Sequence, residues 1–417
     1  MARDILIVGG GVIGLCTAYY CARRGDRVTV LERNSEQRDG CSFGNAGMVV
    51  PSHFIPLAAP GMVALGLKWM WNPESPFYIQ PRLDWKLLSW GWKFWRCSTL
   101  EHVARSAPLL RDLSVASRAG FEELAALPGN DFGLVKQGLL VLCRSQHALD
   151  EESMTAQRAL TLNVPAQILN AHQTASMDPG VRMDVAGSVY FPLDCHLSPH
   201  RFLAGLQRQL EALGTRFLWN TRVMDWRVSK RRIEAVVTNQ GDVSADEYVL
   251  CGGAWSSESA ATLGLSLPMQ AGKGYSLTLA RPRQLPRICA IFSEARVAVT
   301  PMGSSLRFGG TMELSGMNED INPVRVQGIL KSVPKYYPDF APEDFEDVQP
   351  WRGLRPCSPD GMPYFGRFKN YENLSTATGH AMMGLSLGPV TGRLMAQLLA
   401  GEPLDINVNL LSPDRFG

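Results

Sequence analysis

The sequence predicts a mixed α/β fold with two domains. One is a Rossmann-like domain assembled from separate stretches of the chain, and the other is a cap domain based on a second β-sheet. Three observations support this. The chain opens with a strand–loop–helix–strand unit, it returns later to two apolar strands that end in small residues, and its 417 residues exceed the usual length of one domain.

The opening unit occupies residues 3–33. Residues 4–8 form an apolar run typical of a buried strand, residues 15–24 predict a helix, and residues 27–32 predict the next strand. Between the first strand and the helix, residues 9–14 read Gly-Gly-Gly-Val-Ile-Gly and fit the pattern G-x-G-x-x-G. A strand, loop, helix and strand in this order predict a dinucleotide site.

Each residue type in the loop has a physical role. Gly9 suits the tight turn, Gly11 lets the backbone approach a pyrophosphate, and Gly14 lets the helix pack on the strand. Val12 and Ile13 lead from the loop to the helix, whose free N–H groups and positive dipole end favour phosphate.

The second strand ends in an acidic residue followed by a basic one. The Glu32 carboxylate can accept hydrogen bonds from both ribose hydroxyls of an adenosine, and it would repel a 2′-phosphate. Neighbouring Arg33 weakens that exclusion. The pair therefore favours FAD or NAD over NADP.

Composition and charge exclude several classes of protein. A net charge of +2 without a dense basic tract argues against nucleic-acid binding. Nine cysteines, none spaced as C-x-x-C, argue against a disulfide framework and fit a reducing, cytoplasmic compartment. Residues 41–67 are uncharged, but their three prolines would break a membrane helix. His196 and His200 flank Pro199 with no further ligand evident, so no metal site is expected.

The rest of the chain alternates between helical and strand patterns. Helices are expected at 101–127 and 198–213, and strands at 138–143, 216–219, 223–228, 233–238 and 248–251. Two later segments are expected to reach the same nucleotide as the opening unit. They are the strand that leads to Gly252 and Ala254, and a strand at 374–379 that ends in Gly379. A loop over 380–387 then precedes a helix at about 388–399.

These two segments, together with the opening unit, predict a nucleotide domain that is discontinuous in the sequence. FAD is large enough to require such a domain. The expected FAD-binding domain comprises residues 1–52, 145–262 and 350–417. Residues 53–144 and 263–349 are expected to form the substrate-binding or cap domain.

The chain resembles the flavoprotein family of glycine oxidase, D-amino-acid oxidase and sarcosine oxidase. Within this family it most resembles the bacterial D-amino-acid dehydrogenases. The resemblance covers nearly the whole chain. It is carried by residues 8–14 (VGGGVIG), 41–48 (CSFGNAGM), 272–276 (GKGYS), 351–356 (WRGLRP), 359–363 (PDGMP), 379–380 (GH) and 384–389 (GLSLGP).

The resemblance implies where FAD would bind. Ser42, Asn45, Gly47 and Met48 would lie along the pyrophosphate and flavin, and Val223 would contact the adenosine side. Backbone N–H groups near the flavin N1 and C2 carbonyl would come from Gly384, Leu385, Ser386 and Leu387. Some relatives attach flavin through a cysteine in the region of Cys357, but the spacing here differs, so the FAD is expected to be non-covalent.

The implied reaction is oxidation of an α-amino acid by hydride transfer from Cα to flavin N5, giving an imine and then a 2-oxo acid. By resemblance, Arg355 would anchor the substrate carboxylate, since a guanidinium fork binds carboxylate with two hydrogen bonds. The Tyr275 hydroxyl is a second candidate contact with substrate, and a core aromatic residue is the alternative. His53 would contact substrate, tune the flavin, or simply line the site.

The chain departs from the glycine oxidase pattern at Met382, where the oxidase has a second arginine. Apolar Met382 and Met383 suggest a larger, more apolar pocket than glycine needs. This favours larger D-amino acids or cyclic imino acids such as D-proline and hydroxy-D-proline.

Six of the ten tryptophans lie between Trp69 and Trp95, interleaved with lysines and an arginine. One interpretation is a surface that contacts the inner face of a membrane and meets a quinone. The other is a helical cap over the active site. The two are compatible, and a quinone or another acceptor would then reoxidise the flavin.

The sequence therefore favours a FAD-dependent D-amino-acid dehydrogenase. A second hypothesis is an oxidase of glycine or sarcosine that uses oxygen. A third, of another class, is a nucleotide-binding redox sensor without turnover, which would have no need of Arg355 or Tyr275.

Overall fold

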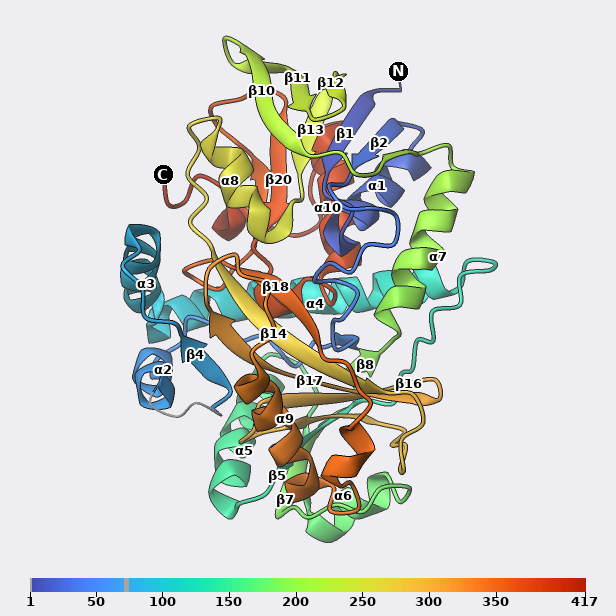
Figure 1. Cartoon of the computed structure of the whole chain (residues 1–417), viewed down its shortest axis with the longest axis vertical. Helices are drawn as coiled ribbons and strands as arrows, with labels where there is room; N and C mark the ends of the chain where they lie inside the picture. Colours follow the sequence, from blue (N-terminus) through green and yellow to red (C-terminus); the bar gives the residue numbers. More distant parts are fainter. Residues whose placement is uncertain (1, 71–74) are drawn as a thin grey trace.

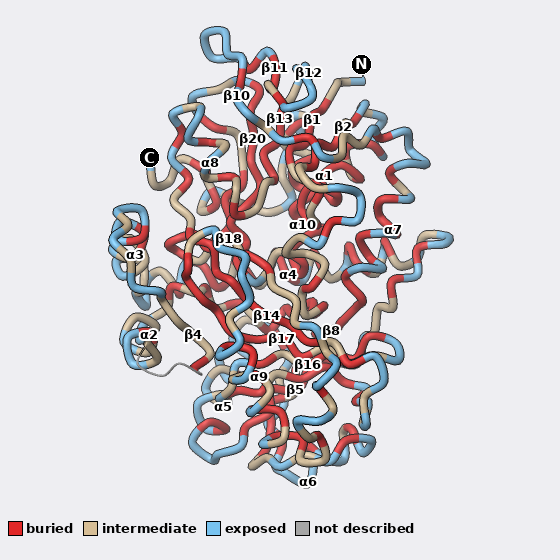
Figure 2. The backbone as a smooth tube through the Cα atoms, viewed as in Figure 1, coloured by how far each residue is buried: buried red, intermediate tan, exposed pale blue. Residues whose placement is uncertain are grey.

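The computed structural model describes residues 2–70 and 75–417 and shows two large sheets stacked along the long axis. The six-stranded sheet contains the N-terminal strand, and the nine-stranded sheet forms the other half (Figure 1). The chain passes several times between the two halves, and one hydrophobic core contains buried residues from both of them (Figure 2). The predicted mixed α/β fold is confirmed.

The six-stranded sheet is of the Rossmann type. Five neighbouring strands run parallel, and β19 pairs antiparallel with β20 at one edge. Its order is β19 (Tyr364–Arg367), β20 (Leu374–Thr378), β13 (Glu247–Leu250), β1 (Asp4–Val8), β2 (Arg27–Leu31) and β9 (Arg216–Leu218). The domain is discontinuous, as expected, because its central strands come from residues 4–8, 247–250 and 374–378.

Alternation of side chains explains why both faces of this sheet are covered. Ile5 and Ile7 pack in the large core beneath helices, whereas Leu6 and Val8 face a separate apolar cluster. The helical face is covered by α1 (Val12–Arg23), α4 (Leu100–Ala125), α7 (Pro199–Ala212) and α10 (Gly388–Ala400). The other face is covered by α8 (Ser256–Ala261) and by a three-stranded sheet of β10 (Val223–Ser229), β11 (Arg232–Thr238) and β12 (Gly241–Val243).

The nine-stranded sheet is mostly antiparallel. Its order is β18 (Trp351–Cys357), β14 (Gln270–Leu279), β17 (Ser305–Leu314), β16 (Val297–Met302), β15 (Cys289–Phe292), β5 (Leu139–Cys143), β7 (Gly187–Phe191) and β6 (Gln167–Asn170), with β4 (Phe77–Ile79) beside β17. Helix α9 (Pro323–Tyr336) packs on it, with α5 (Gln146–Thr161) and α6 (Ala171–Met177) near its far edge. A short ribbon, β3 (Met48–Val49) with β8 (Cys195–His196), lies between the two halves.

Sheet membership corrects the expected domain boundaries. Residues 145–262 and 350–417 were expected to join the FAD-binding domain, but β6, β7 and β18 belong to the nine-stranded sheet. The reason is strand pairing: β7 continues the ladder of β5, and β18 completes the edge beside β14. Conversely α4, expected in the cap, packs against α10.

The tryptophan-rich region forms α2 (Met62–Met70) and α3 (Trp85–Cys97) at one side of the molecule (Figure 1). Trp71, one of the six tryptophans, lies outside the described residues. Across the part of the chain that the structure describes, no helix is long and apolar enough to cross a membrane.

Candidate active site

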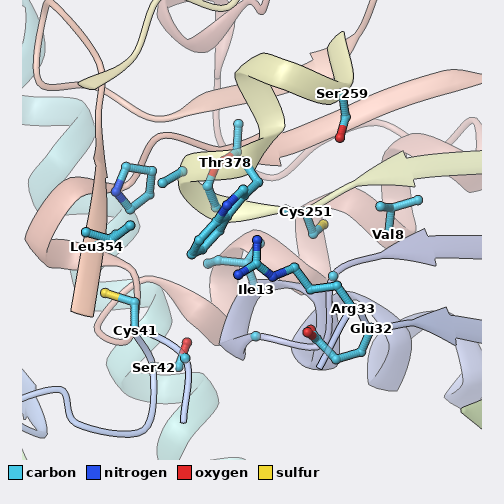
Figure 3. A pocket seen from close by; sticks show the side chains of 18 of the residues that line it. Val8, Ile13, Glu32, Arg33, Cys41, Ser42, Cys251, Ser259, Leu354 and Thr378 are labelled. Carbon is cyan, nitrogen blue, oxygen red and sulfur yellow. Dashed lines mark hydrogen bonds between the residues drawn. The ribbon is translucent and has the colours of Figure 1, made fainter. Parts of the chain in front are cut away.

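A cavity of about 510 Å³ lies between the carboxyl ends of the parallel strands and the edge of the nine-stranded sheet. Ligands of open parallel sheets bind at this edge. Figure 3 shows Glu32 and Arg33 at one end of the cavity and Leu354 with Cys41 at the other. The cavity thus connects the predicted nucleotide end to the predicted substrate end.

The glycine loop has the geometry that the sequence predicts. Gly9 has a φ of +117°, and a Cβ there would lie 2.4 Å from the Cys251 carbonyl oxygen. A Cβ on Gly14 would lie 1.9 Å from the Gly9 carbonyl oxygen, so only glycine allows α1 to approach this closely. Gly11, Val12 and Ile13 line the cavity.

The acidic end of β2 closes the same part of the cavity. Glu32 is buried, and its carboxylate accepts hydrogen bonds from the backbone N–H groups of Gly10 (2.8 Å) and Asn34 (2.9 Å). Each oxygen keeps a lone pair for a ribose hydroxyl. Arg33 lines the cavity with its guanidinium 3.7 Å from the centre of the Trp255 ring, so stacking occupies one of its faces.

Other predicted cofactor residues lie along the same wall. Val223, Gly252 and Ala254 line the cavity where β10 begins and β13 ends. Ser42 and Asn45 line it from the loop after β2, and the Val12 N–H donates to the Ser42 hydroxyl at 3.0 Å. This bond ties the loop to the start of α1.

Gly47 and Met48 do not line the cavity. Gly47 has a φ of +79° and donates its N–H to the Asn45 side-chain oxygen at 2.8 Å, so it shapes the loop that presents Asn45. Met48 is buried in β3, opposite His196.

The predicted cofactor residues of the C-terminal segment also include some that line the cavity and some that do not. Gly384 and Leu385 line the cavity, whereas Gly379, Ser386 and Leu387 do not. Gly379 has a φ of +75° and packs beside the Tyr364 ring. The Ser386 hydroxyl accepts the Val50 N–H at 3.0 Å and so connects this segment to β3. Leu387 precedes α10 as its N-cap.

Arg355 lies at the far end of the cavity. One guanidinium nitrogen donates to the Thr311 carbonyl at 2.7 Å, which leaves its other N–H groups for a ligand. Cys41 and Ala381 line the same cavity, and so do Leu354 and Pro356, whose side chains face the opposite side of β18 from Arg355. A single guanidinium with free N–H groups is suited to bind one carboxylate.

The structure places Tyr275 in the core and not in the lining of this cavity, so its contact with substrate stays a prediction. A Cβ on neighbouring Gly274 would lie 2.1 Å from the Arg355 guanidinium, so Gly274 faces that side chain. Successive residues of a strand face opposite sides, and Tyr275 therefore packs in the core beneath α9. Its hydroxyl donates to Glu313 (2.9 Å) and accepts from the Asn322 N–H (3.2 Å).

His53 and Met382 are also absent from the cavity lining. His53 contacts the Ser52 hydroxyl at 3.0 Å, which in turn donates to buried Asp194, and burial lowers the pKa of His53 to about 4. Met382 is 46% exposed, so the apolar character of the site comes instead from Leu354, Pro356 and Ala381.

Several lining residues were not predicted as site residues. His380 is the most informative: its Nε2 contacts Thr391 at 3.1 Å, its Nδ1 has no partner within the described chain, and burial lowers its pKa to about 3. Its position beside Gly379 in a family motif was a usable signal. Trp255 and Ser259 also line the cavity, but no sequence motif marked them. They lie after the predicted strand, where the path of the chain could not be predicted.

Comparison with known proteins decides the family. The model of the family described as FAD dependent oxidoreductase matches residues 4–398. The chain belongs to this family. It is 33% identical over 417 residues to a D-amino acid dehydrogenase from Bradyrhizobium diazoefficiens, covering 99% of this chain and 98% of the relative. It is 30% identical to a D-amino acid dehydrogenase from Vibrio atlanticus, covering 99% and 100%.

Solved structures share the fold of this FAD-dependent oxidoreductase. Glycine oxidase from Geobacillus kaustophilus superposes with a TM-score of 0.79 at 24% identity, covering 99% of each chain. L-proline dehydrogenase from P. horikoshii superposes with a TM-score of 0.77 at 16% identity, covering 100% of this chain and 98% of that one. The predicted resemblance is confirmed, and the chain is a FAD-dependent oxidoreductase.

The residues present fit FAD. Gly9 and Gly11 line the cavity at the turn before α1, Glu32 has free lone pairs at the ribose position, and the buried Nδ1 of His380 has no partner among the described residues. Non-covalent attachment remains a prediction.

Proposed function

We propose that this enzyme oxidises D-amino acids or cyclic imino acids, with D-proline and hydroxy-D-proline as the imino acids of interest. The observation that carries the proposal is the Arg355 guanidinium in the lining of the FAD cavity, next in the strand to Leu354, which lies at the end opposite Glu32 (Figure 3). The names of relatives that are 30–33% identical over nearly their whole length support the D-amino-acid class.

The apolar part of the cavity lining supports a substrate with a hydrocarbon side chain or ring. Leu354 and Ala381 are buried, and Pro356 and Cys41 complete that part of the lining. Contact with these groups would favour a substrate larger than glycine, because each buried CH₂ group contributes about 0.8 kcal/mol.

The chain's own residues would act mainly by orientation. Arg355 would hold the carboxylate, and the Thr311 carbonyl would hold Arg355 in place. His380, kept neutral by burial, would leave the site without a competing positive charge. When bound, FAD supplies the acceptor for the hydride that leaves the substrate Cα.

The decisive experiment is anaerobic bleaching of the bound flavin by a panel of D- and L-amino acids and imino acids. Rapid bleaching by D-amino acids or by D-proline, with L-enantiomers much slower, is expected. Bleaching by L-amino acids alone would contradict the proposal.

A glycine or sarcosine oxidase is the second candidate, favoured by the structural likeness to glycine oxidases. Met382 stands where that pattern has an arginine, and it does not line the cavity. Bleaching by glycine or sarcosine with rapid, stoichiometric peroxide formation in air would put this candidate first.

We infer further that a quinone or an artificial dye reoxidises the flavin faster than oxygen does, and that the enzyme works in the cytoplasm, peripherally on the inner face of the membrane. The relatives named dehydrogenases support the first inference. Stopped-flow reoxidation of the reduced enzyme in air tests it, and reoxidation within milliseconds would contradict it.

A further inference from the structure

Helix α3 carries an apolar stripe on the side that faces solvent. The stripe consists of Trp85, Leu88, Trp92 and Trp95, which are 86%, 53%, 54% and 61% exposed. Their spacing of three or four residues aligns them along one face of the helix. Large apolar side chains gathered in this way on a free surface mark an interaction site.

The charged residues within α3 are all of one sign. Lys86, Lys93 and Arg96 flank this outer stripe, and α3 contains no acidic residue from Trp85 to Cys97. The Arg96 guanidinium lies 4.8 Å from the centre of the Trp92 ring, so the cations and the apolar stripe form one surface. Asp84, just before the helix, is engaged with Arg82 and with the N-terminal N–H groups of α3.

The opposite face of α3 packs on the wall of the active site. Leu87 and Trp90 are buried in a cluster with Ala381 and Cys357. The Trp90 indole N–H donates to the Cys357 carbonyl at 2.9 Å, two residues beyond Arg355. One helix, about 10 Å thick, therefore separates the outer stripe from the cavity wall.

We propose that the outer stripe of α3 docks on an anionic lipid bilayer. Tryptophan and leucine would enter the interface between headgroups and acyl chains, while the lysines and the arginine would meet anionic headgroups. A second copy of the chain is the other candidate occupant. In a two-fold dimer it would bring Lys86, Lys93 and Arg96 against themselves, so charge favours the bilayer.

Docking would place the active-site wall next to the membrane, where a lipid-soluble acceptor is concentrated. This consequence rests on the proposed function, because it assumes a quinone acceptor. The docking itself does not, since it is measured without turnover.

The test is co-sedimentation of the purified holoenzyme with vesicles. Binding is expected to vesicles of phosphatidylcholine with 30% phosphatidylglycerol, weaker binding to phosphatidylcholine alone, and weaker binding in 0.5 M salt. Replacing Lys86, Lys93 and Arg96 together by glutamine should weaken binding about 100-fold, because each basic residue near an anionic surface contributes about fivefold.

Two matched double variants test whether vesicle binding depends on the outer stripe of α3 or on exposed apolar residues in general. Trp92→Ser with Trp95→Ser should weaken vesicle binding at least tenfold and leave dye-linked activity in solution unchanged. Met154→Ser with Leu160→Ser removes two exposed apolar residues (64% and 53%) from α5 instead, and should leave vesicle binding intact.

The proposal is overturned if the wild-type enzyme does not sediment with anionic vesicles at low salt. It is also overturned if the α3 and α5 variants lose binding equally. A dimer in solution that the Trp92 and Trp95 changes dissociate, without vesicle binding, would assign the stripe to a second copy.

Discussion

The two ends of the cavity are built by different means. At the nucleotide end, Gly9, Gly14 and Glu32 lie within one stretch of 24 residues and act through backbone space and backbone hydrogen bonds. At the Arg355 end, the guanidinium depends on Gly274 and Thr311, which reach it from neighbouring strands of the nine-stranded sheet. The first end is a local motif, and the second is a product of strand register.

This difference teaches where substitutions should act. Changes at the nucleotide end should affect folding and FAD together, because backbone atoms cannot move aside. Changes at the Arg355 end should affect substrate binding alone, because a long side chain can move without disturbing the sheet.

The largest effect is expected from Gly14→Ala. Its Cβ would lie 1.9 Å from a backbone oxygen, so α1 must shift, and we expect a loss of more than about 3 kcal/mol in unfolding free energy together with loss of bound FAD. Denaturant unfolding and flavin absorbance measure both. The control is Gly91→Ala, where a Cβ meets nothing within 4 Å. A stable, yellow Gly14→Ala protein would break the comparison.

Arg355→Lys should act at the other end only. Lysine keeps the charge but loses the planar fork, so a bidentate carboxylate contact should weaken by about 1.5–3 kcal/mol, seen as a rise in KM. FAD affinity and unfolding should stay near wild type. If the variant instead loses flavin while remaining molecules keep a normal KM, Arg355 is structural.

A smaller effect is expected from Gly274→Ala. The new Cβ would fall 2.1–2.2 Å from the guanidinium of Arg355, the mobile end of a long side chain, so that group should move while the sheet stays intact. We expect KM to rise about tenfold, or about 1.4 kcal/mol. Gly309→Ala, whose Cβ would meet only ordinary contacts at 3.7 Å or beyond, is the control on the next strand. Equal kinetics in the two variants would contradict the idea.

The smallest effect is expected from Tyr275→Phe. It removes the hydroxyl that joins Glu313 to the Asn322 N–H, so the free energy of unfolding should fall by about 1 kcal/mol with KM unchanged. Thermal unfolding and steady-state kinetics together decide. A raised KM at normal stability would restore Tyr275 as a substrate contact.

The same contrast explains what the sequence could predict. The opening unit was predictable because its glycines and Glu32 follow one another at fixed spacing, and the helices at α4, α7 and α10 followed from apolar periodicity. Arg355 was predictable only through its family motif.

Tyr275 shows why the rest was not predictable. Its motif was recognisable, but which side of the sheet each residue faces depends on the pairing of β14 with β17 and β18, more than 25 residues away along the chain. A shift by one residue would exchange Gly274 and Tyr275 between the faces. The sheet membership of β6, β7 and β18 was missed for the same reason, because long-range pairing leaves no local pattern.

The interrupted six-stranded sheet also has a consequence for synthesis on the ribosome. Strand β1 pairs with β2 at once, but its other neighbour, β13, is translated about 240 residues later, where Leu6 meets Tyr248. At ordinary translation speeds of 5–20 residues per second, the free edge of β1 waits roughly 10–50 s. During that time an apolar, unpaired strand is open to other chains. The nascent protein should therefore depend on chaperones until β13 emerges, and slower translation should lower its soluble yield.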